Sequence, residues 1–579
     1  MYWIDVCNQI LIFATLAMSL NLLLGYAGQV SVAHAAFAAI GGYASGYLAL
    51  KSGVSVPLAF AIGILGAGLL GIVVSLPALL LSGEYMILLT LSVQTIVLIV
   101  ITSIGALGGL YGLTGLPTVS FFGKELLRPE DWLVPLIIVN VVILGLLTWI
   151  GESPFGRILR GIRDDQLATQ SLGKDVWVKK IIVFGLTSAI AGLGGALLAY
   201  YNGVTAPGLF EFNQSILIVT MVVVGGRGNL VGSILGAAVV IGAGPFFEKV
   251  INLSPETSAL WRLIAFGVLL IVVLMLRPQG LLPEGLSIQA LIRKLRSRSA
   301  VEEPVVAPAP VPASTPGNGT APAGDGGEPI LKVSDVRKSF GGIHAVNGLS
   351  FELPRGRVTG LIGPNGAGKT TVFNLLTGAI TLDEGTVELR GEDITGWPID
   401  RVARHGMVRS FQDVRIFPSL TVLDNVRMAV QQQRGESLRD LFLMPWSVVR
   451  DQRRTIRRAR EKLGFVGLAD KENQLAGSLP FGEQKLLALA RILAADAEIF
   501  LLDEPASGID AEWVDQMVEI IRRLADSGMT VCIVEHNLHV VERVADNVYF
   551  MDGGQIVAEG TMEDLVKAEN LVEAYFGQP

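Results

Sequence analysis

Cysteine is almost absent from the chain, which has only Cys7 and Cys532 in 579 residues. The two lie in different halves, so a disulfide framework is excluded, and both are expected to be small apolar residues in buried segments. An excess of basic charge is also absent, since the formal net charge is −7. Binding to nucleic-acid phosphates depends on basic charge, so no nucleic-acid partner is expected.

Charged residues of either sign are scarce in the first half of the chain. Residues 1–284 hold 13 Lys/Arg and 13 Asp/Glu, and the remaining 295 residues hold 71 of the 97 charges. The whole chain is 51% hydrophobic with a mean hydropathy of +0.53, which is too apolar for an ordinary soluble protein. We therefore expect an all-α, polytopic membrane domain over 1–284, followed by a water-soluble domain.

The membrane domain is expected to contain eight or nine spanning helices, because each needs about 20 apolar residues to cross the hydrocarbon core. A basic region typical of a cleavable signal is lacking at the N-terminus, so the first run is expected to be a retained helix. The motif "VVVGGRGNLVGS" breaks the seventh and eighth runs, for which a re-entrant arrangement is the alternative. The candidate runs are 4–24, 32–50, 56–81, 85–107, 133–150, 181–201, 214–226, 231–247 and 260–276.

Basic residues predict the orientation of this domain. The loop "FGRILRGIRDDQLATQSLGKDVWVKK" carries six Lys/Arg, and the tail "RPQGLLPEGLSIQALIRKLRSR" is basic too, so both are expected on the cytoplasmic side. Five segments before the loop would then place the N-terminus outside. In the stretch "LLGYAGQVSVAHAAF", either a discontinuous helix or a loop between two helices explains the interruption by polar residues and glycine.

A linker separates the two halves. Residues 285–329 begin with the basic tail and continue as "SAVEEPVVAPAPVPASTPGNGTAPAGDGGEP", which holds seven prolines and few bulky hydrophobic residues. Such a composition cannot bury enough apolar area to fold, so a tether is expected here. The soluble domain is then expected over 330–579. The linker is typical of a fusion joint between two once-separate proteins.

The strongest motif of the soluble half is a phosphate-binding loop. An apolar strand precedes "GPNGAGKTT" and a helix follows it, which is the context that supports the P-loop interpretation. Successive backbone N–H groups and the helix N-terminus would bind a nucleotide phosphate, Lys369 would reach the β- and γ-phosphates, and the Thr370 hydroxyl would bind Mg²⁺. The expected ATP-binding residues are Gly363, Pro364, Asn365, Gly366, Ala367, Gly368, Lys369, Thr370 and Thr371.

Acidic residues end a second apolar strand, "AEIFLLDEPASGID". In an open α/β sheet, ligands bind beyond the carboxyl ends of the strands. Asp503 is therefore expected to hold Mg²⁺ through water, and Glu504 to act as general base toward the attacking water. A third strand, "MTVCIVEHNL", places His536 where it can contact the γ-phosphate.

Two further residues complete the predicted site. Gln412, in "VRSFQDVRIF", follows a short strand, and its amide can coordinate Mg²⁺ or the attacking water. Phe340 precedes the P-loop by 23 residues and is expected to stack on adenine; an exposed loop aromatic is the alternative.

Taken together and in their order along the chain, these motifs make residues 330–579 resemble the nucleotide-binding domain of an ABC transporter. The resemblance implies an α/β P-loop fold with a helical subdomain and a small antiparallel β part. It also implies that Asp510 belongs to the D-loop, that His536 is the switch histidine, and that "LPFGEQ" is the signature that completes the ATP site of an opposing domain. The implied nucleotide-binding residues of the signature are Leu479, Gly482, Glu483 and Gln484.

Pro480 departs from the commonest form of this signature, which has Ser at that position. Proline offers neither a hydroxyl nor an N–H group, so one donor to a phosphate oxygen is missing, which corresponds to about 1.5–3 kcal/mol for a charge-assisted bond. Either the remaining backbone donors suffice or the site closes less tightly.

The subfamily resembled is that of branched-chain amino acid importers. "WSVVRDQRRTIRRAREKLGFVGLADK" and "LVEAYFG" are similar to their ATPase, whereas "GRILRGIRDDQLATQSLG", "VVVGGRGNLVGSILGA" and "LRPQGL" are similar to their permease. Ala168, Thr169 and Gly173 loosely match the importer cytoplasmic-loop motif, with Leu167 in place of its Glu. The implied role is a coupling helix that docks on the ATPase near Gln412; a solvated basic loop is the alternative.

The resemblance implies an ATP-driven half-importer in the bacterial cytoplasmic (inner) membrane, with its ATPase on the cytoplasmic side. The implied partners are a second permease and ATPase, which would be paralogous or a second copy of this chain, a periplasmic or lipid-anchored solute-binding protein, and the surrounding membrane lipid. Urea or a short amide is the alternative solute. An exporter, or a regulatory ATPase with a membrane anchor, are the alternative classes.

Overall fold

The computed structural model describes residues 1–79, 81, 83–246, 249, a part of 261–284 and 329–566. The linker expected over 285–329, about half of the ninth candidate span and the terminal "LVEAYFG" lie outside the described residues, apart from Pro329 at the linker's end. The chain divides into two compact units, of which the first comprises 1–163 and 177–305. The second comprises 164–176 together with 306–579.

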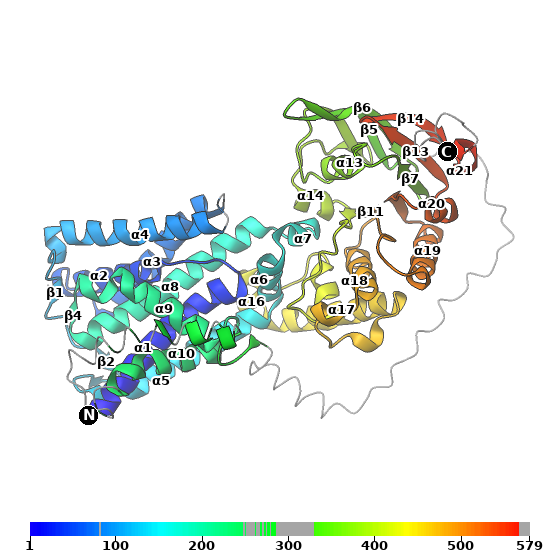
Figure 1. Ribbon diagram of the computed structural model, residues 1–579. Coiled ribbons are helices and arrows are strands. Elements are labelled where there is room, and N and C mark those ends of the chain that lie inside the picture. The colour runs from blue at the N-terminus through cyan, green and yellow to red at the C-terminus, as the bar shows by residue number, and fades with distance from the viewer. Residues whose placement is uncertain are drawn as a thin grey trace. The chain divides into compact units, whose positions relative to one another are not determined.

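The first unit is built from apolar helices (Figure 1). Six helices in the described part of the chain are long and apolar enough to cross a membrane, against the eight or nine expected, while α2 and α10 are shorter or less apolar. Its principal helices are α1 (Tyr2–Asn21), α2 (His34–Lys51), α3 (Val56–Leu79), α4 (Glu84–Ser103), α5 (Pro129–Glu152), α6 (Pro154–Asp164), α8 (Val176–Asn202), α9 (Phe212–Gly225) and α10 (Leu230–Pro245).

Small residues let these helices approach one another closely. A Cβ built on Gly41 of α2 would lie 2.0 Å from the carbonyl oxygen of Gly192 in α8, so only glycine fits there. Close backbone approach compensates for the weak hydrophobic drive between helices in lipid. Residues 27–33 form a short non-helical stretch between a π-helical turn (Leu22–Tyr26) and α2, so the apolar run "LLGYAGQVSVAHAAF" is interrupted as expected.

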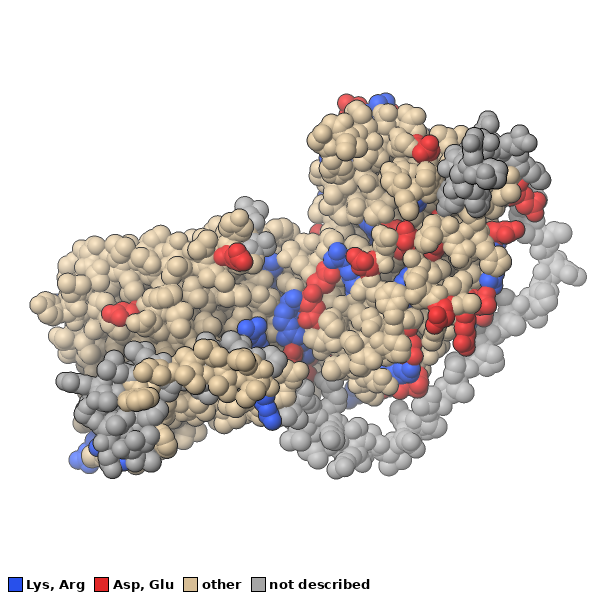
Figure 2. Space-filling model, viewed as in Figure 1, with Lys and Arg blue, Asp and Glu red and all other residues tan. Residues whose placement is uncertain are grey.

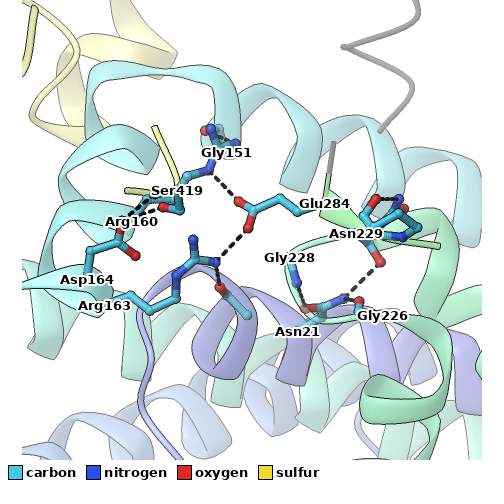
Figure 3. Close-up of polar contacts among 12 residues, drawn as sticks. Asn21, Gly151, Arg160, Arg163, Asp164, Gly226, Gly228, Asn229, Glu284 and Ser419 are labelled. Atoms are coloured by element: carbon cyan, nitrogen blue, oxygen red, sulfur yellow. Dashed lines mark hydrogen bonds and ion pairs between the residues drawn. The ribbon is translucent and has the colours of Figure 1, made fainter. Parts of the chain in front are cut away.

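The Asn21 side chain stabilises the loop between α9 and α10 by hydrogen bonds to its backbone (Figure 3). Its Nδ2 donates to the carbonyl oxygens of Gly226 and Asn229 at 3.1 and 2.9 Å, and its Oδ1 accepts from the N–H of Gly228 at 2.8 Å. A buried side-chain amide therefore satisfies backbone groups that the helices leave unpaired. This loop is the point at which "VVVGGRGNLVGS" was expected to interrupt the apolar run.

An ion cluster joins α6 to the segment that follows the last apolar run. Arg160 Nε and Arg163 Nη1 lie 3.4 and 2.9 Å from the two carboxylate oxygens of Glu284 (Figure 3). Arg160 Nη2 also lies 2.9 Å from Glu152 Oε1. These are four of the 26 charged residues that the sparsely charged first half contains. Figure 2 shows the same contrast on the surface, where charged side chains are rare over the apolar helices and frequent over the second unit.

The second unit contains a six-stranded sheet in the order β10-β11-β12-β7-β13-β14, with only β14 antiparallel to its neighbour. The central strands are fully buried apolar runs, as expected when helices cover both faces of a parallel sheet. The strands are β7 (Val358–Ile362), β10 (Met407–Arg409), β11 (Ile499–Asp503), β12 (Thr530–Val534), β13 (Asn547–Asp552) and β14 (Gln555–Gly560).

A separate antiparallel sheet and a set of helices complete this unit. The sheet has the order β6-β5-β8-β9, from β5 (Leu331–Phe340), β6 (Ile343–Leu353), β8 (Glu384–Leu389) and β9 (Glu392–Asp393). The helices are α7 (Gln166–Ser171), α13 (Lys369–Leu376), α14 (Ile399–Arg404), α15 (Val422–Ala429), α16 (Leu438–Leu443), α17 (Pro445–Phe465), α18 (Phe481–Leu493), α19 (Ala511–Asp526), α20 (Leu538–Val544) and α21 (Met562–Val566). The expected α/β fold with helical and antiparallel parts is confirmed.

Candidate active site

The P-loop lies between β7 and α13, as its sequence context predicted. Gly363 has φ +151°, and a Cβ there would lie 1.9 Å from the Met551 carbonyl oxygen, so a side chain is excluded. Lys369 Nζ donates to the carbonyl oxygens of Gly363 and Pro364 at 2.7 and 2.8 Å. Burial lowers the pKa of Lys369, while Glu504 and Asp503 act in the opposite direction. The ammonium therefore lies over the loop whose N–H groups can bind phosphate.

The three predicted catalytic side chains meet at the carboxyl ends of neighbouring strands. Gln412 Nε2 donates to Glu504 Oε2 at 3.1 Å, and His536 Nδ1 lies 3.8 Å from the same oxygen. Parallel pairing of β10, β11 and β12 brings these ends together, because each residue follows a strand that ends on the same edge. Their contact is a finding, whereas their roles in hydrolysis remain predictions.

Glu504 adopts a left-handed backbone conformation with φ +47°, which is uncommon for a residue with a side chain. Its N–H donates to the Val534 carbonyl oxygen at 2.8 Å, and its own carbonyl oxygen accepts from Lys485 Nζ at 3.0 Å. Such conformations cost about 1–3 kcal/mol and persist when surrounding contacts hold them. The two contacts fix the turn that carries the predicted base.

Asp503 is buried, with 1% of its surface exposed, and forms a pair with Arg409. Arg409 Nη2 donates to Asp503 Oδ2 at 2.7 Å, and Arg409 Nη1 donates to Asn374 Oδ1 at 2.5 Å. Asp503 Oδ1 has no hydrogen-bond partner among the described residues. Burial raises the pKa of this carboxyl, and the Arg409 guanidinium opposes the rise. One carboxylate oxygen is thus held and the other is left for a further ligand.

This arrangement fits a magnesium ion better than a protein-only metal cage. No group of three or more His, Cys, Asp or Glu that could hold a metal occurs in the part of the chain that the structure describes. Mg²⁺ is typically bound by one or two protein oxygens together with substrate phosphates and water. The unpartnered oxygen of Asp503 and the Thr370 hydroxyl in the first turn of α13 are hard oxygen ligands of that kind.

Three buried residues next to this site were missed from the sequence. Lys485 Nζ also donates to the Ser507 carbonyl oxygen, and Glu535 Oε1 accepts from the Ala506 N–H at 2.7 Å. Oppositely charged side chains therefore hold the loop that follows Glu504, while Arg409 holds Asp503. Burial lowers the pKa of Lys485 and raises the pKa of Glu535. The available signal was a charged residue in an otherwise apolar run, as in "CIVEH" and "GEQKLLALA".

The predicted signature residues begin α18. Pro480 immediately precedes the helix, where its missing N–H is tolerated, and a Cβ on Gly482 would lie 3.1 Å from the Trp513 ring. Glu483 Oε1 accepts from Lys471 Nζ at 2.7 Å, so its side chain is engaged within the unit and only its backbone N–H remains for a phosphate. Leu479 accepts from the side chain of Gln484 at 2.7 Å.

Phe340 and Asp510 lie at the ends of elements. Phe340 ends β5 and is 48% exposed, with Lys338 Nζ 5.5 Å from the centre of its ring. Its exposed face can stack on a base, as the sequence predicted. Asp510 is exposed and precedes α19. Neither is joined to the Glu504 cluster by an interaction recorded among the described residues, and their roles remain predictions.

The second unit also contains a segment from the loop between two membrane-domain helices. Residues 164–176, including α7, belong to it by their contacts. Ser419 Oγ donates to Asp164 Oδ2 at 2.5 Å, and Arg415 Nη1 donates to Asp165 Oδ2 at 2.8 Å (Figure 3 shows the first of these). Arg415 is three residues after Gln412, so the segment docks where the resemblance implied.

Lys174 provides a buried charged contact of this segment. With 1% of its side chain exposed, its Nζ donates to Glu436 Oε1 at 2.6 Å and to the Val430 carbonyl oxygen at 2.7 Å. Gln431 Nε2 donates to the Leu172 carbonyl oxygen at 2.8 Å. A buried ammonium needs such partners, because an unpaired one is strongly disfavoured.

Comparison with known proteins agrees with both halves. Residues 2–274 match the sequence profile described as the permease component of the branched-chain amino acid transport system, and residues 346–507 match the ABC transporter profile. The high-affinity branched-chain amino acid transport ATP-binding protein LivG of Salmonella typhimurium is 37% identical over 252 residues, which are 43% of this chain and 99% of the relative. BraF of Pseudomonas aeruginosa, which has the same description, is 36% identical over 252 residues; these are 43% of this chain and 98% of BraF.

A solved structure, the ADP conformation of an ATP-binding cassette of an ABC transporter, is 32% identical to this chain. It covers 44% of this chain and 100% of its own, with a TM-score of 0.39.

An ABC-type ATPase joined to a polytopic permease is the class that the fold, the P-loop site and these matches define. The chain belongs to the branched-chain amino acid ABC transporter family, with the permease and the ATP-binding component in one polypeptide. It binds nucleotide and hydrolyses ATP.

Proposed function

We propose that this protein is one half of an importer for branched-chain or other hydrophobic amino acids in the bacterial inner membrane. The observation that carries the proposal is the docked segment 164–176, which comes from the loop between membrane-domain helices and lies within the ATPase unit. The amino-acid class is supported by the permease match and by the printed names of the relatives.

In the proposed reaction, Glu504 accepts a proton from the water that attacks the γ-phosphate, and Gln412 and His536 orient that water and the phosphate. Their contacts with Glu504 Oε2 support this arrangement. Lys369 and the P-loop N–H groups hold the β- and γ-phosphates. Mg²⁺, bound by Thr370, Asp503 and Gln412, would supply charge neutralisation when present.

Two ATPase domains are required in this proposal, because the signature residues would serve a nucleotide on another subunit. The second permease and ATPase are proposed to be paralogous, with a second copy of this chain as the alternative. A periplasmic or lipid-anchored binding protein would deliver the solute. Closure of the ATPase pair would reach the permeases through the docked segments and drive alternating access.

Uptake into proteoliposomes tests this function. The chain would be reconstituted with its partner subunits, and ATP-dependent uptake of labelled leucine and labelled urea would be measured with and without the binding protein. Leucine uptake that requires the binding protein is expected. Urea uptake alone would support the alternative solute, whereas efflux or uptake without a binding protein would contradict the importer proposal.

A further inference from the structure

The ATPase unit exposes an apolar corner where α16 meets α17 (both helices are in Figure 1). Its members are Phe442, Leu443, Met444 and Trp446, whose exposed fractions are 47, 70, 53 and 87%. Single exposed apolar residues are ordinary, but four in a run of five mark an interaction surface. None of them belongs to the ATP site or to the docked segment.

The local sequence explains why these side chains face outward. Helix α16 is only six residues long, and its buried residue is Leu441. In the first turn of α17 the buried residue is Val448. Pro445 begins α17 and prevents α16 from continuing into it. With Leu441 and Val448 directed inward, the apolar residues between them have no core to enter.

Arginines continue the exposed face from this corner along α17. Arg450, Arg453, Arg454 and Arg457 are exposed and share one face with Trp446, because they follow it at helical spacing. No ion pair is recorded for these four among the described residues, whereas Arg458 and Arg460 pair with Asp496 and Glu472. Residues 434–460 contain eight arginines and three acidic residues in a chain of net charge −7.

The three acidic residues of this stretch do not neutralise that face. Glu436 pairs with Lys174, Asp451 accepts from the Arg434 N–H at 2.8 Å, and Asp440 is half-buried in α16. The Trp446 face therefore combines an apolar end with a net positive charge, since arginines outnumber acidic residues in this stretch. This is the composition of a surface that lies on anionic lipid headgroups.

The corner also lies near the docked segment of the same unit. Glu436 is two residues before α16, and its partner Lys174 is two residues before α8, one of the helices long enough to span a membrane. A six-residue helix such as α16 is only about 9 Å long. The corner is thus close to the docked segment 164–176, which belongs to the same unit.

We propose that the corner and the arginine face of α17 bind the anionic lipid surface of the membrane in which the permease lies. Trp446 and its apolar neighbours would enter the interfacial region, where aromatic side chains are favoured, and the four arginines would contact the headgroup phosphates. The contact would hold the helical subdomain at the membrane independently of the docked segment.

The test uses the full chain with its partner subunits in lipid nanodiscs. After Cys7→Ser, an environment-sensitive fluorophore is attached at Trp446→Cys, or at Glu519→Cys on the exposed face of α19 as the matched control. The nanodiscs contain phosphatidylcholine with or without about one quarter phosphatidylglycerol. At 446 we expect a blue-shifted emission and about twofold stronger quenching by brominated lipid when the anionic lipid is present; at 519 neither is expected.

Two arginine variants separate charge from folding. Replacement of Arg450, Arg453, Arg454 and Arg457 by Gln should abolish the effect of phosphatidylglycerol at position 446, and replacement of all four by Lys should retain it. A probe that stays in water in both lipid compositions would overturn the proposal. So would shielding that is independent of lipid charge but lost when the partner subunits are removed, since that result would identify a protein contact.

Discussion

At the residue scale, the hydrolytic site depends on how the backbone holds Glu504. Its left-handed conformation is maintained by the Val534 carbonyl oxygen and by Lys485, and its carboxylate lies against Gln412 and His536. A general base needs a fixed position as well as an accepting oxygen. Both properties meet in one residue, whose neighbours come from β12, from the ends of β10 and β12, and from α18.

Replacement of Glu504 by Gln should leave ATP binding intact and lower ATP turnover by about 10²-fold or more, because the shape is kept while the proton acceptor is lost. Steady-state hydrolysis and nucleotide binding would be measured on the purified complex, together with retention of a closed ATPase pair. The variant Glu519→Gln, at an exposed position of α19, provides the control. Hydrolysis at the wild-type rate would contradict the assignment of the base.

Glu535 should make the ATPase unit less stable as the pH rises. Burial raises the pKa of its carboxyl above the ordinary 4.5. The protonated carboxyl therefore adds to the free energy of unfolding in full below pH 4.5, and this addition is lost as the pH rises through the raised pKa. Glu535→Gln keeps an oxygen for the Ala506 N–H and removes the titration.

The unfolding temperature would be measured in detergent from about pH 5 to pH 8, the range in which a raised carboxyl pKa acts. We expect the variant to gain stability relative to the unmodified protein toward the upper end of the range. A difference that does not change with pH would show that this carboxyl keeps one charge state throughout.

At the scale of elements, α7 and the residues around it connect the permease sequence to the ATPase. Their contacts are mainly polar and charged: Asp164 with Ser419, Asp165 with Arg415, and Lys174 with Glu436. Charged contacts discriminate between partners more than they add affinity. The segment can therefore help this permease to select this ATPase if the proposed complex holds two unlike pairs.

The Lys174–Glu436 pair provides a charge-reversal test. Lys174→Glu should greatly reduce ATP-coupled transport, because breaking a buried pair costs about 3–5 kcal/mol. The double variant Lys174→Glu with Glu436→Lys should recover part of the coupling. Transport per ATP hydrolysed would be compared in proteoliposomes.

The exposed pair Lys332–Glu352 serves as the matched control, since its side chains are 51 and 48% exposed and such pairs contribute only about 0–1 kcal/mol. Its reversal should leave coupling unchanged. Equal loss in the single and double variants at 174 and 436 would refute a direct pairing role.

At the scale of the whole molecule, one polypeptide carries both a permease and an ATPase but only one signature. Because that signature is expected to complete a site on another subunit, hydrolysis should require two ATPase domains. ATPase activity would be measured in nanodiscs that hold one chain, two chains, or one chain with its paralogous partner. We expect activity only when two ATPase domains share a disc; full activity of solitary chains would contradict the requirement.

Much of this architecture follows from local sequence patterns. The apolar runs, the strand–loop–helix context of the P-loop and the acidic strand ends are visible without the fold, because each depends on neighbouring residues. The sequence predicts that Gln412, Glu504 and His536 lie at one edge of a sheet, because the carboxyl ends of parallel strands share that edge. The docked segment was likewise predictable from a local motif, the one that contains Ala168, Thr169 and Gly173.

The tertiary structure alone decided which distant groups meet. Arg409, Lys485 and Glu535 hold Asp503 and the loop after Glu504, but a charge in an apolar run does not reveal its partner in the sequence. The burial of Lys174 against Glu436, 262 residues away, was equally beyond local patterns. Spacing along a chain predicts which side chains share an element, whereas the pairing of buried charges depends on how separate elements pack.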